Sequence, residues 1–172
     1  MPLSFVPEIE SDRFWIRTIL VAAFGRSSEA DLVDTIRNSP NFIPELSLLA
    51  VENGKAIAYL LFSRIAIATP ERSVSALCLA PLAVMPASQG QGIGTQLVQA
   101  GLSKCRELGE RLVLVVGEPH YYQRFGFHKA IDYGLNSSLP LPDDVFMVLE
   151  LAPGVLQNLR GTVQYPAYFE GV

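Results

Sequence analysis

The stretch from Leu82 to Thr95, LAVMPASQGQGIGT, constrains the fold more than any other part of the chain. An apolar run ends at Pro86, whose ring nitrogen has no proton to donate to a strand ladder. A polar loop with three glycines follows, and apolar residues then recur at helical spacing up to Leu108. A strand, a glycine-rich loop and a helix start therefore come in succession. This arrangement directs backbone N–H groups and the positive end of a helix dipole at one point, where a phosphate is the natural ligand.

The spacing of the glycines distinguishes among three phosphate-binding loops. A Walker A loop needs Gly-Lys followed by Ser or Thr, but here Thr95 follows Gly94 directly. A dinucleotide fingerprint G-x-G-x-x-G/A fails as well, because its last position, counted from Gly90, is Thr95. The pattern that fits is Gln89-x-x-Gly92-x-Gly94. It is similar to the Q/R-x-x-G-x-G/A loop with which the GCN5-related N-acetyltransferases (GNATs) hold the pyrophosphate of acetyl-CoA.

Composition excludes several classes of protein. A chain of 172 residues with 49% hydrophobic residues is long and apolar enough for one domain with a substantial core. The net charge of −4 and the absence of a Lys/Arg run argue against a nucleic-acid partner. We expect neither a signal peptide nor a membrane span, and therefore a cytoplasmic protein. Cys78 and Cys105 lie in apolar segments without metal-ligand neighbours, so we expect core side chains and no metal.

The first half of the chain is predicted to contain two helices followed by hairpin-connected strands. The pair Asn53-Gly54 is a strong hairpin signal, because it tolerates the positive φ of a type I′ turn. Capping residues and apolar spacing give the expected bounds. The elements are an edge strand at Leu3–Val6, helices between Ser11 and Gly25 and between Ser27 and Pro40, and strands at Leu46–Val51, Ala56–Ala68 and Ser75–Val84.

The second half is predicted to contain a strand–helix–strand crossover and a sheet-edge tail. Arg111–Gly117 is almost continuously apolar, as in a strand buried on both faces. A short helix follows and ends at Gly126, and the segment from Phe127 onward has the composition of an irregular surface loop. Val145–Leu151 is a further strand, and Gly161–Phe169 either pairs with the sheet edge or packs on it. The order of elements indicates an α/β fold with a mixed sheet.

This order resembles the GNAT fold across nearly the whole chain. A second motif supports the resemblance: in YYQRFGF, starting at Tyr121, Tyr122 stands at the tyrosine of the family's Y-x-x-x-G-F segment. The motifs PLAV-x-P, GxGIG and G-T-V-x-Y-P are similar to the YhbS-like group. The resemblance implies a central, mostly antiparallel sheet, splayed at the cofactor site, with helices on both faces. One departure is Gly117-Glu118-Pro119, where many relatives carry an Asn after the fifth strand.

The resemblance implies transfer of an acetyl group from acetyl-CoA to a primary amine of a small molecule or peptide, by direct attack in a ternary complex. The backbone of Leu82, Ala83 and Val84 would pair with the pantetheine arm, and an N–H near Ala83 or Val84 would polarise the thioester carbonyl. Tyr122 would donate its phenolic proton to the CoA sulfur, and Phe125 would contact the cofactor. The implied pyrophosphate contacts are backbone N–H groups of Gly90, Gln91, Gly92, Ile93, Gly94 and Thr95. Gln89 would either steady the loop or reach a phosphate oxygen.

The general base is less clearly indicated. Glu118 stands at the end of the predicted fifth strand and His120 two residues on, and either could take a proton from the amine. A first-turn helix carboxylate is the structural alternative for Glu118, and a surface residue is the alternative for His120. Glu29 and Glu45 are further candidates, and an enzyme without a dedicated base is also consistent with the sequence. Acceptor selectivity is expected from the Phe24–Glu29 junction, the Asn38–Pro44 loop and Ala130–Asp144.

Other interpretations remain open. A non-catalytic acetyl-CoA-binding or regulatory module would keep the fold and the loop but lack turnover. A nucleotide-binding oxidoreductase would use Glu118 for a ribose, but the loop lies mid-chain after hairpin strands and has Thr95 in the third glycine position. The expected organisation is one N-acetyltransferase domain over residues 1–172, with a core at about 3–151 and an extension at 152–172. Exposed sheet edges make a homodimer plausible.

Overall fold

The computed structural model describes residues 3–172, which form two compact units. The first unit comprises the chain up to Ser63, the segment Ala80–Lys104 and Val172. The second comprises Arg64–Leu79 and Cys105–Gly171. The long strands β3 and β4, Lys55–Ala68 and Ser73–Val84, contribute residues to both units. The expected single domain, whose first two residues lie outside the described range, and the homodimer stay predictions.

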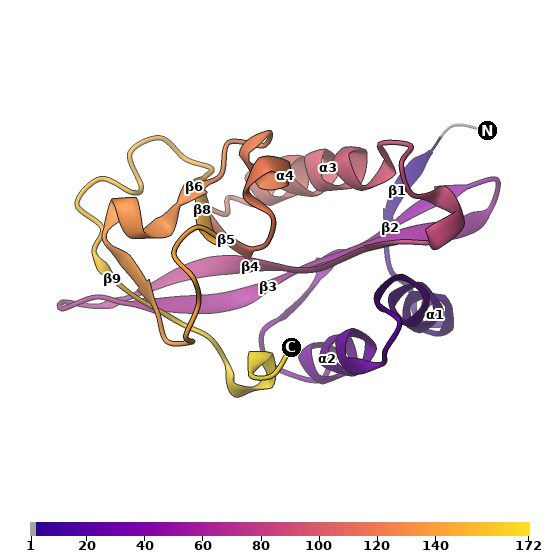
Figure 1. The fold of residues 1–172 in the computed structure, drawn as a ribbon, viewed down its shortest axis with the longest axis horizontal. Helices are drawn as coiled ribbons and strands as arrows, with labels where there is room; N and C mark the ends of the chain where they lie inside the picture. The colour runs from indigo at the N-terminus through magenta and orange to yellow at the C-terminus, as the bar shows by residue number, and fades with distance from the viewer. Residues whose placement is uncertain (1–2) are drawn as a thin grey trace. The chain divides into compact units, whose positions relative to one another are not determined.

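Helices, short 3-10 turns (η) and strands alternate along the chain (Figure 1). Their order is β1 Ser4–Pro7, η1 Glu10–Asp12, α1 Arg13–Phe24, α2 Ser28–Arg37, β2 Phe42–Glu52, β3 Lys55–Ala68, β4 Ser73–Val84, η2 Pro86–Ser88, α3 Ile93–Glu107, β5 Leu112–Val116, α4 Pro119–Gln123, β6 His128–Lys129, η3 Ala130–Tyr133, β7 Leu135–Ser137, β8 Phe146–Glu150, β9 Gly161–Gln164 and η4 Ala167–Phe169. The ladders β1–β2, β2–β3, β3–β9, β5–β8 and β6–β8 are antiparallel, whereas β4–β5 and β7–β9 are parallel. The predicted α/β fold with a mixed, mostly antiparallel sheet is confirmed.

In the first unit, β3 is covered on both faces. A Cβ added at Gly101 of α3 would lie 2.6 Å from Phe62 and 2.9 Å from Leu60, so these side chains face α3. Tyr59, next in the alternation of the strand, points to the other face, which α1 and α2 cover (Figure 1). Burial on both faces explains why this part of β3 is continuously apolar, and it confirms the expected helices on both faces.

The hairpin between β2 and β3 has the predicted turn. Glu52 pairs with Lys55, and the two residues between them have positive φ, 54° at Asn53 and 75° at Gly54. The strand β2 begins at Phe42, earlier than predicted, because the β2–β3 register shifts between Phe42 and Ser47. An irregular ladder of this kind interrupts the period-two pattern by which a strand start is recognised.

In the second unit, β5 lies between β4 and β8. Leu77–Leu79 of β4 pair in parallel with Val113–Val115, and β8 pairs along the other edge of β5. Beyond these pairs β4 continues to Val84, past the cis peptide bond between Ala80 and Pro81. The tail strand β9 pairs with the end of β3 and with β7.

The segment after Phe127 is more ordered than the sequence predicts. Two short strands, β6 and β7, and the turn η3 lie within it, so the prediction of an irregular loop from Phe127 onward is wrong in this part. Strands of two and three residues are too short to show a period-two pattern. They exist because β8 and β9 offer edges for them to pair with.

Candidate active site

The glycine loop of the first unit combines a tight turn with a helix start. After β4, residues Pro86–Ser88 form one 3-10 turn, and Gly90 and Gly92 then adopt positive φ of 78° and 77°. An L side chain is disfavoured at such φ, which is why glycine is needed at both positions. A Cβ at either glycine would meet no atom within 4 Å, so the space beside the loop backbone is open.

The side chain of Gln89 braces this loop. Its Nε2 donates to the carbonyl oxygen of Val84 at 3.0 Å, which ties the loop back to the end of β4. The Met85 N–H in turn donates to the Ile57 carbonyl of β3 at 2.8 Å. Of the two roles expected for Gln89, steadying the loop is the one that these contacts support.

The helix α3 starts directly after the loop. Gln96 N–H donates to the Gly92 carbonyl at 3.1 Å and makes the first helical hydrogen bond. The N–H groups of Ile93 and Gly94 precede it in the first turn and have no partner inside the helix. They point out of the helix N-terminus, where the helix dipole is positive, and this favours an anion.

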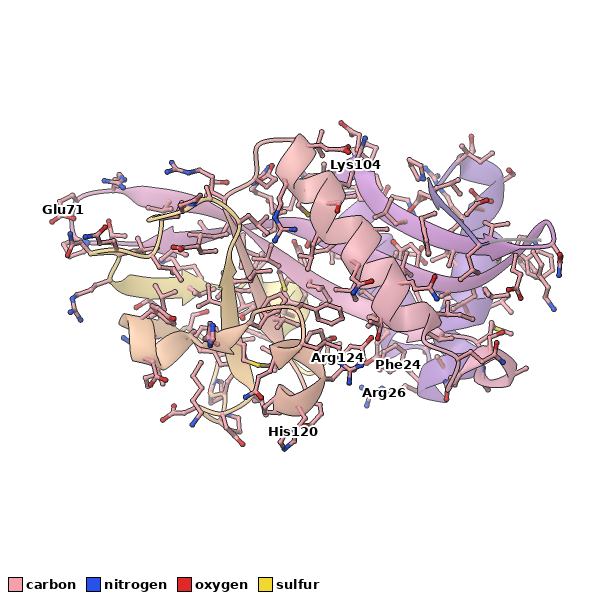
Figure 2. The ribbon with its side chains drawn as sticks, turned by 90° about the horizontal axis from the view of Figure 1, so that it is seen from above. Phe24, Arg26, Glu71, Lys104, His120 and Arg124 are labelled. Carbon is pink, nitrogen blue, oxygen red and sulfur yellow. The ribbon has the colours of Figure 1, made fainter. Side chains whose placement is uncertain are left out.

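The second unit holds Glu118, His120, Tyr122 and Phe125 on and beside α4. Glu118 is the N-cap of this helix, and its Oε1 accepts from the His120 N–H at 2.9 Å. Pro119 occupies the first helical position, where its missing N–H costs nothing. The side chain of His120 is exposed and projects away from the ribbon (Figure 2). The structural alternative for each residue, a capping carboxylate and a surface imidazole, is thus consistent with its environment.

Tyr122 is the buried aromatic residue of α4. Its ring packs edge-on against Tyr121 at 5.0 Å between ring centroids and against Phe127 at 5.8 Å, and it lies 6.3 Å from the half-exposed Phe125. Burial raises the pKa of the Tyr122 hydroxyl, and the nearby ionisable groups of Tyr121 and Cys78 raise this pKa further. The Tyr122 phenol is therefore neutral at physiological pH and can donate a hydrogen bond.

Gly117 makes room for the Tyr122 ring. A Cβ at Gly117 would lie 2.5 Å from Cε2 of Tyr122, a distance that real Cβ atoms do not reach. Gly117, the first residue of the segment Gly117-Glu118-Pro119, therefore has a packing role here. No local pattern in the sequence indicates this role, because the contact forms only once α4 folds back over the end of β5.

Two further carboxylates named from the sequence lie in the first unit. Glu29 is buried on α2, and its carboxylate accepts two hydrogen bonds from Arg26. Arg26 Nε donates to Oε1 at 2.9 Å and Nη2 donates to Oε2 at 2.5 Å. The Arg26 hydrogen bonds lower the pKa of Glu29, and this outweighs the opposing effect of burial. Arg26 lies near Phe24 at the end of α1 (Figure 2). Glu45 is exposed on β2.

The cysteines and candidate ligands have ordinary environments. Cys78 and Cys105 are free and buried, and burial raises the thiol pKa of each to about 12, so both stay protonated. Residues 3–172 contain no group of three or more His, Cys, Asp or Glu side chains arranged to hold a metal ion. Among the helices of this described part, none combines the length and apolar content that a bilayer span requires.

One candidate residue was missed from the sequence. The hydroxyl oxygen of Tyr165, just after β9, is shielded from solvent and has no hydrogen-bond partner within the described residues. The available signal was its position two residues after the buried Val163. If the alternation of β9 continues by one residue, the Tyr165 ring points inward as Val163 does. No pattern in the sequence indicates that the hydroxyl would lack a partner.

Comparison with known proteins identifies relatives along most of the chain. A sequence model described as the acetyltransferase (GNAT) family matches residues 14–127. The uncharacterized N-acetyltransferase YjhQ of Escherichia coli K12 is 40% identical over 136 residues, which cover 78% of this chain and 75% of YjhQ. The uncharacterized N-acetyltransferase YhbS of the same strain is 34% identical over 163 residues, which cover 94% and 95% of the two chains.

Solved structures agree with the sequence relatives. The crystal structure of YhbS from Escherichia coli in complex with CoA superposes with a TM-score of 0.89 at 32% identity, covering 97% of this chain and 91% of that one. A GNAT family acetyltransferase from Brucella melitensis in complex with acetyl-CoA gives a TM-score of 0.79 at 29% identity, covering 98% and 99%.

Proposed function

The chain belongs to the GNAT acetyltransferase family, and on that premise we propose that it transfers the acetyl group of acetyl-CoA to a primary amine of a small molecule or peptide. The amine attacks the thioester directly while both substrates are bound. The observation that carries this proposal is the glycine loop, with its open space beside Gly90 and Gly92 and the α3 N-terminus behind it. The CoA and acetyl-CoA complexes of the two related structures support the same choice of donor.

In this proposal the loop binds the pyrophosphate of the donor. Backbone N–H groups from Gly90 to Thr95 donate to phosphate oxygens, and the α3 dipole adds a favourable field. Gln89 keeps the loop in shape through its bond to Val84. Gln91 and Ile93 contribute through their backbone, so the identity of their side chains matters less.

The end of β4 is proposed to bind the pantetheine arm. The β4–β5 pairs end at Leu79 while β4 continues to Val84, so the backbone of Leu82–Val84 is suited to pair with the amide groups of the arm. An N–H of Ala83 or Val84 would then donate to the thioester oxygen and stabilise the negative charge that develops there during attack. Phe125 is proposed to pack against the cofactor.

Tyr122 is proposed as the hydrogen-bond donor to the leaving sulfur. The nitrogen lone pair of the amine forms the new C–N bond, the C–S bond breaks, and the sulfur takes a proton to give CoA. Because burial raises the Tyr122 pKa, the phenol is a weaker acid than a thiol, whose reference pKa is about 8.5. Tyr122 therefore acts by hydrogen bonding in step with C–S cleavage and is not a resting-state acid.

The surplus proton of the amine must also leave. Glu118 and His120 stay the candidates for accepting it, through water, since both are solvent-exposed at the start of α4. The bond from the His120 N–H to Glu118 occupies one carboxylate oxygen and leaves the other for a water molecule. An enzyme that binds the amine in its deprotonated form needs neither Glu118 nor His120 as a base. Replacing both residues at once distinguishes the two mechanisms, because turnover falls only if one of these residues accepts the proton.

Acetyl-CoA binding by calorimetry tests the proposal, comparing the wild type with Gly92→Glu. The introduced carboxylate stands where the pyrophosphate is expected, so binding should be lost. Gly54→Glu is the matched control, because Gly54 also has a positive φ of 75° and open space around it but lies at the hairpin turn. Binding that survives in Gly92→Glu, or no binding by folded wild type, contradicts the proposal.

Thiol release in a panel of primary amines tests turnover. We expect acetyl-CoA-dependent CoA release that needs both an amine and Tyr122, with a loss of about 10-fold or more in Tyr122→Phe if the hydroxyl assists C–S cleavage. Tight binding without release by any amine would favour the non-catalytic module instead.

A further inference from the structure

The segment GTVQYP at the start of β9 contains a tyrosine for which the proposed reaction has no role. The Tyr165 ring is held in place by Phe146 at 6.4 Å and Phe169 at 5.7 Å between ring centroids. Its backbone N–H donates to Ser138 Oγ at 2.9 Å. The hydroxyl, by contrast, is shielded from solvent and lacks a hydrogen-bond partner in the part of the chain that the structure describes. A buried polar group of this kind carries a desolvation cost that no bond offsets, and native proteins seldom keep one without a use.

Tyr165 and Tyr122 are brought to the same end of β5 from opposite faces. Along β8, Phe146 packs against Tyr165, whereas Leu149, three residues on, reaches to within 3.2 Å of the Cβ position of Gly126, just after α4. Side chains three apart on a strand point to opposite faces. Figure 1 shows the same separation, with α4 on one side of β4 and the yellow η4 turn that follows Tyr165 on the other.

The register of β5 and β8 shows where along these strands the Tyr122 and Tyr165 rings lie. Val116, the last residue of β5, pairs with Phe146 of β8. The next residue of the chain, Gly117, contacts the Tyr122 ring, and Phe146 contacts the Tyr165 ring. Both phenols therefore flank the carboxyl end of β5 within the second unit.

The electrostatic surroundings of the two hydroxyls are alike. Burial raises the pKa of Tyr165, and the ionisable thiol of Cys78 adds to the effect, as it does for Tyr122. At neutral pH the Tyr165 hydroxyl is uncharged, and it can donate one hydrogen bond and accept others.

We propose that Tyr165 is an acceptor-binding residue whose hydroxyl oxygen accepts a hydrogen bond from the N–H of the attacking primary amine. This inference rests on the proposed function and assigns the amine to the face of β5 opposite Tyr122. A neutral primary amine has two N–H donors and one lone pair, so a bond from one N–H to Tyr165 orients the lone pair. Tyr165 neither gains nor loses a proton: the lone pair forms the C–N bond, the C–S bond breaks while Tyr122 donates a hydrogen bond to the departing sulfur, and the surplus amine proton passes through water to the thiolate, which gives CoA.

Ligand binding tests the role of Tyr165 without knowledge of the natural acceptor. The probe is CoA whose sulfur carries CH2–CO–NH–propyl, so that an N–H lies near the position of the attacking amine. The matched ligand has N-methyl in place of that N–H. We expect Tyr165→Phe to bind CoA as the wild type does, while its preference for the N–H probe over CoA falls by about 3- to 10-fold, the range of one hydrogen bond. The preference for the N-methyl ligand should not change.

Thermal unfolding distinguishes this role from a structural one. Because the hydroxyl has no partner among residues 3–172, Tyr165→Phe should unfold at the same temperature as the wild type or a higher one. Tyr133→Phe, which removes an exposed phenol in the same unit, is the control and should alter neither binding nor unfolding.

Each contrary outcome has a distinct meaning. If Tyr165→Phe keeps the full preference for the N–H probe, or unfolds several degrees below the wild type, the acceptor-binding role is wrong while CoA binding by the wild type still supports the proposed function. If the folded wild type binds no CoA, the proposed function fails and this inference fails with it.

Discussion

Two tyrosines, Tyr59 in the first unit and Tyr165 in the second, differ in the bonding of a hydroxyl that is shielded from solvent. The Tyr59 hydroxyl lies 2.7 Å from Ser47 Oγ, and Ser47 donates to the carboxylate of Glu8. Glu8 is also held by Arg37 through two hydrogen bonds of 3.0 Å. The Tyr165 hydroxyl has no such partner. Burial raises the pKa of both phenols, so their protonation state is the same and only their bonding differs.

Under our proposal, this difference distinguishes a phenol that stabilises the fold from one that binds a ligand. The Tyr59 network joins Glu8, which follows β1, to α2, β2 and β3. The polar groups in it are bonded to one another, so it strengthens a unique packing. Tyr165 contributes only its ring to packing. Its hydroxyl carries a desolvation cost that no hydrogen bond offsets, and we propose that a ligand supplies the missing bond.

The strongest test of the network is Arg37→Met. The side chains of Arg37 and Glu8 are only 7% and 4% exposed, so the substitution leaves Glu8 buried without its main partner. We expect a loss of about 3–5 kcal/mol in the free energy of unfolding, measured by urea denaturation. The exposed Arg17, which pairs with Asp31 and Asp34, provides the control Arg17→Met, which should change little.

A double variant sharpens this test. Adding Glu8→Gln to Arg37→Met removes the uncompensated charge and should restore part of the lost stability. An Arg37→Met protein as stable as Arg17→Met would show that the network does not hold the first unit together.

Gly117→Ala tests the positioning of Tyr122 in the second unit. Its Cβ would overlap the Tyr122 ring, so the ring must move, at a cost of about 1–3 kcal/mol in unfolding free energy. We expect turnover of acetyl-CoA to fall with it. In a Tyr122→Phe background Gly117→Ala should still lower stability but should no longer lower turnover, because the hydroxyl that it displaces is already absent. Additive losses of turnover would mean that Gly117 acts on another group.

A comparison of Tyr59→Phe with Tyr165→Phe tests the contrast between the two phenols directly. Removing the Tyr59 hydroxyl breaks its bond to Ser47 and should lower the free energy of unfolding by about 1 kcal/mol. Removing the Tyr165 hydroxyl should lower it by nothing or raise it slightly. Equal losses in the two variants would contradict the contrast.

The smallest expected effect is the pH dependence due to Glu29. Its hydrogen bonds with Arg26 lower its pKa in the folded state relative to the unfolded value of about 4.3. The unfolded state therefore binds more protons between the two pKa values, and the stabilisation is present above the unfolded pKa and lost as pH falls through the folded one. The difference in unfolding free energy between wild type and Glu29→Gln should be constant near neutral pH and shrink in acid. A difference that grows in acid would have the wrong sign.

Local patterns predicted most elements because each depends on neighbouring residues. The Asn53-Gly54 turn, the glycine loop and the α3 start follow from backbone preferences that act within a few positions. The start of β2 and the strands β6 and β7 were not predictable in this way, since a register shift in one case and the edges of β8 and β9 in the other decide them.

The sequence by itself determined the family resemblance, the loop from Gln89 to Thr95 and the tyrosine Tyr122, because these depend on residue type and spacing along a short stretch. Only the tertiary structure decided that Gly117 must lack a side chain, that Tyr59 has a partner and that Tyr165 does not. The physical reason is that hydrogen bonding and packing of a buried side chain depend on atoms from distant segments, which chain folding brings within a few ångströms and which no local pattern specifies.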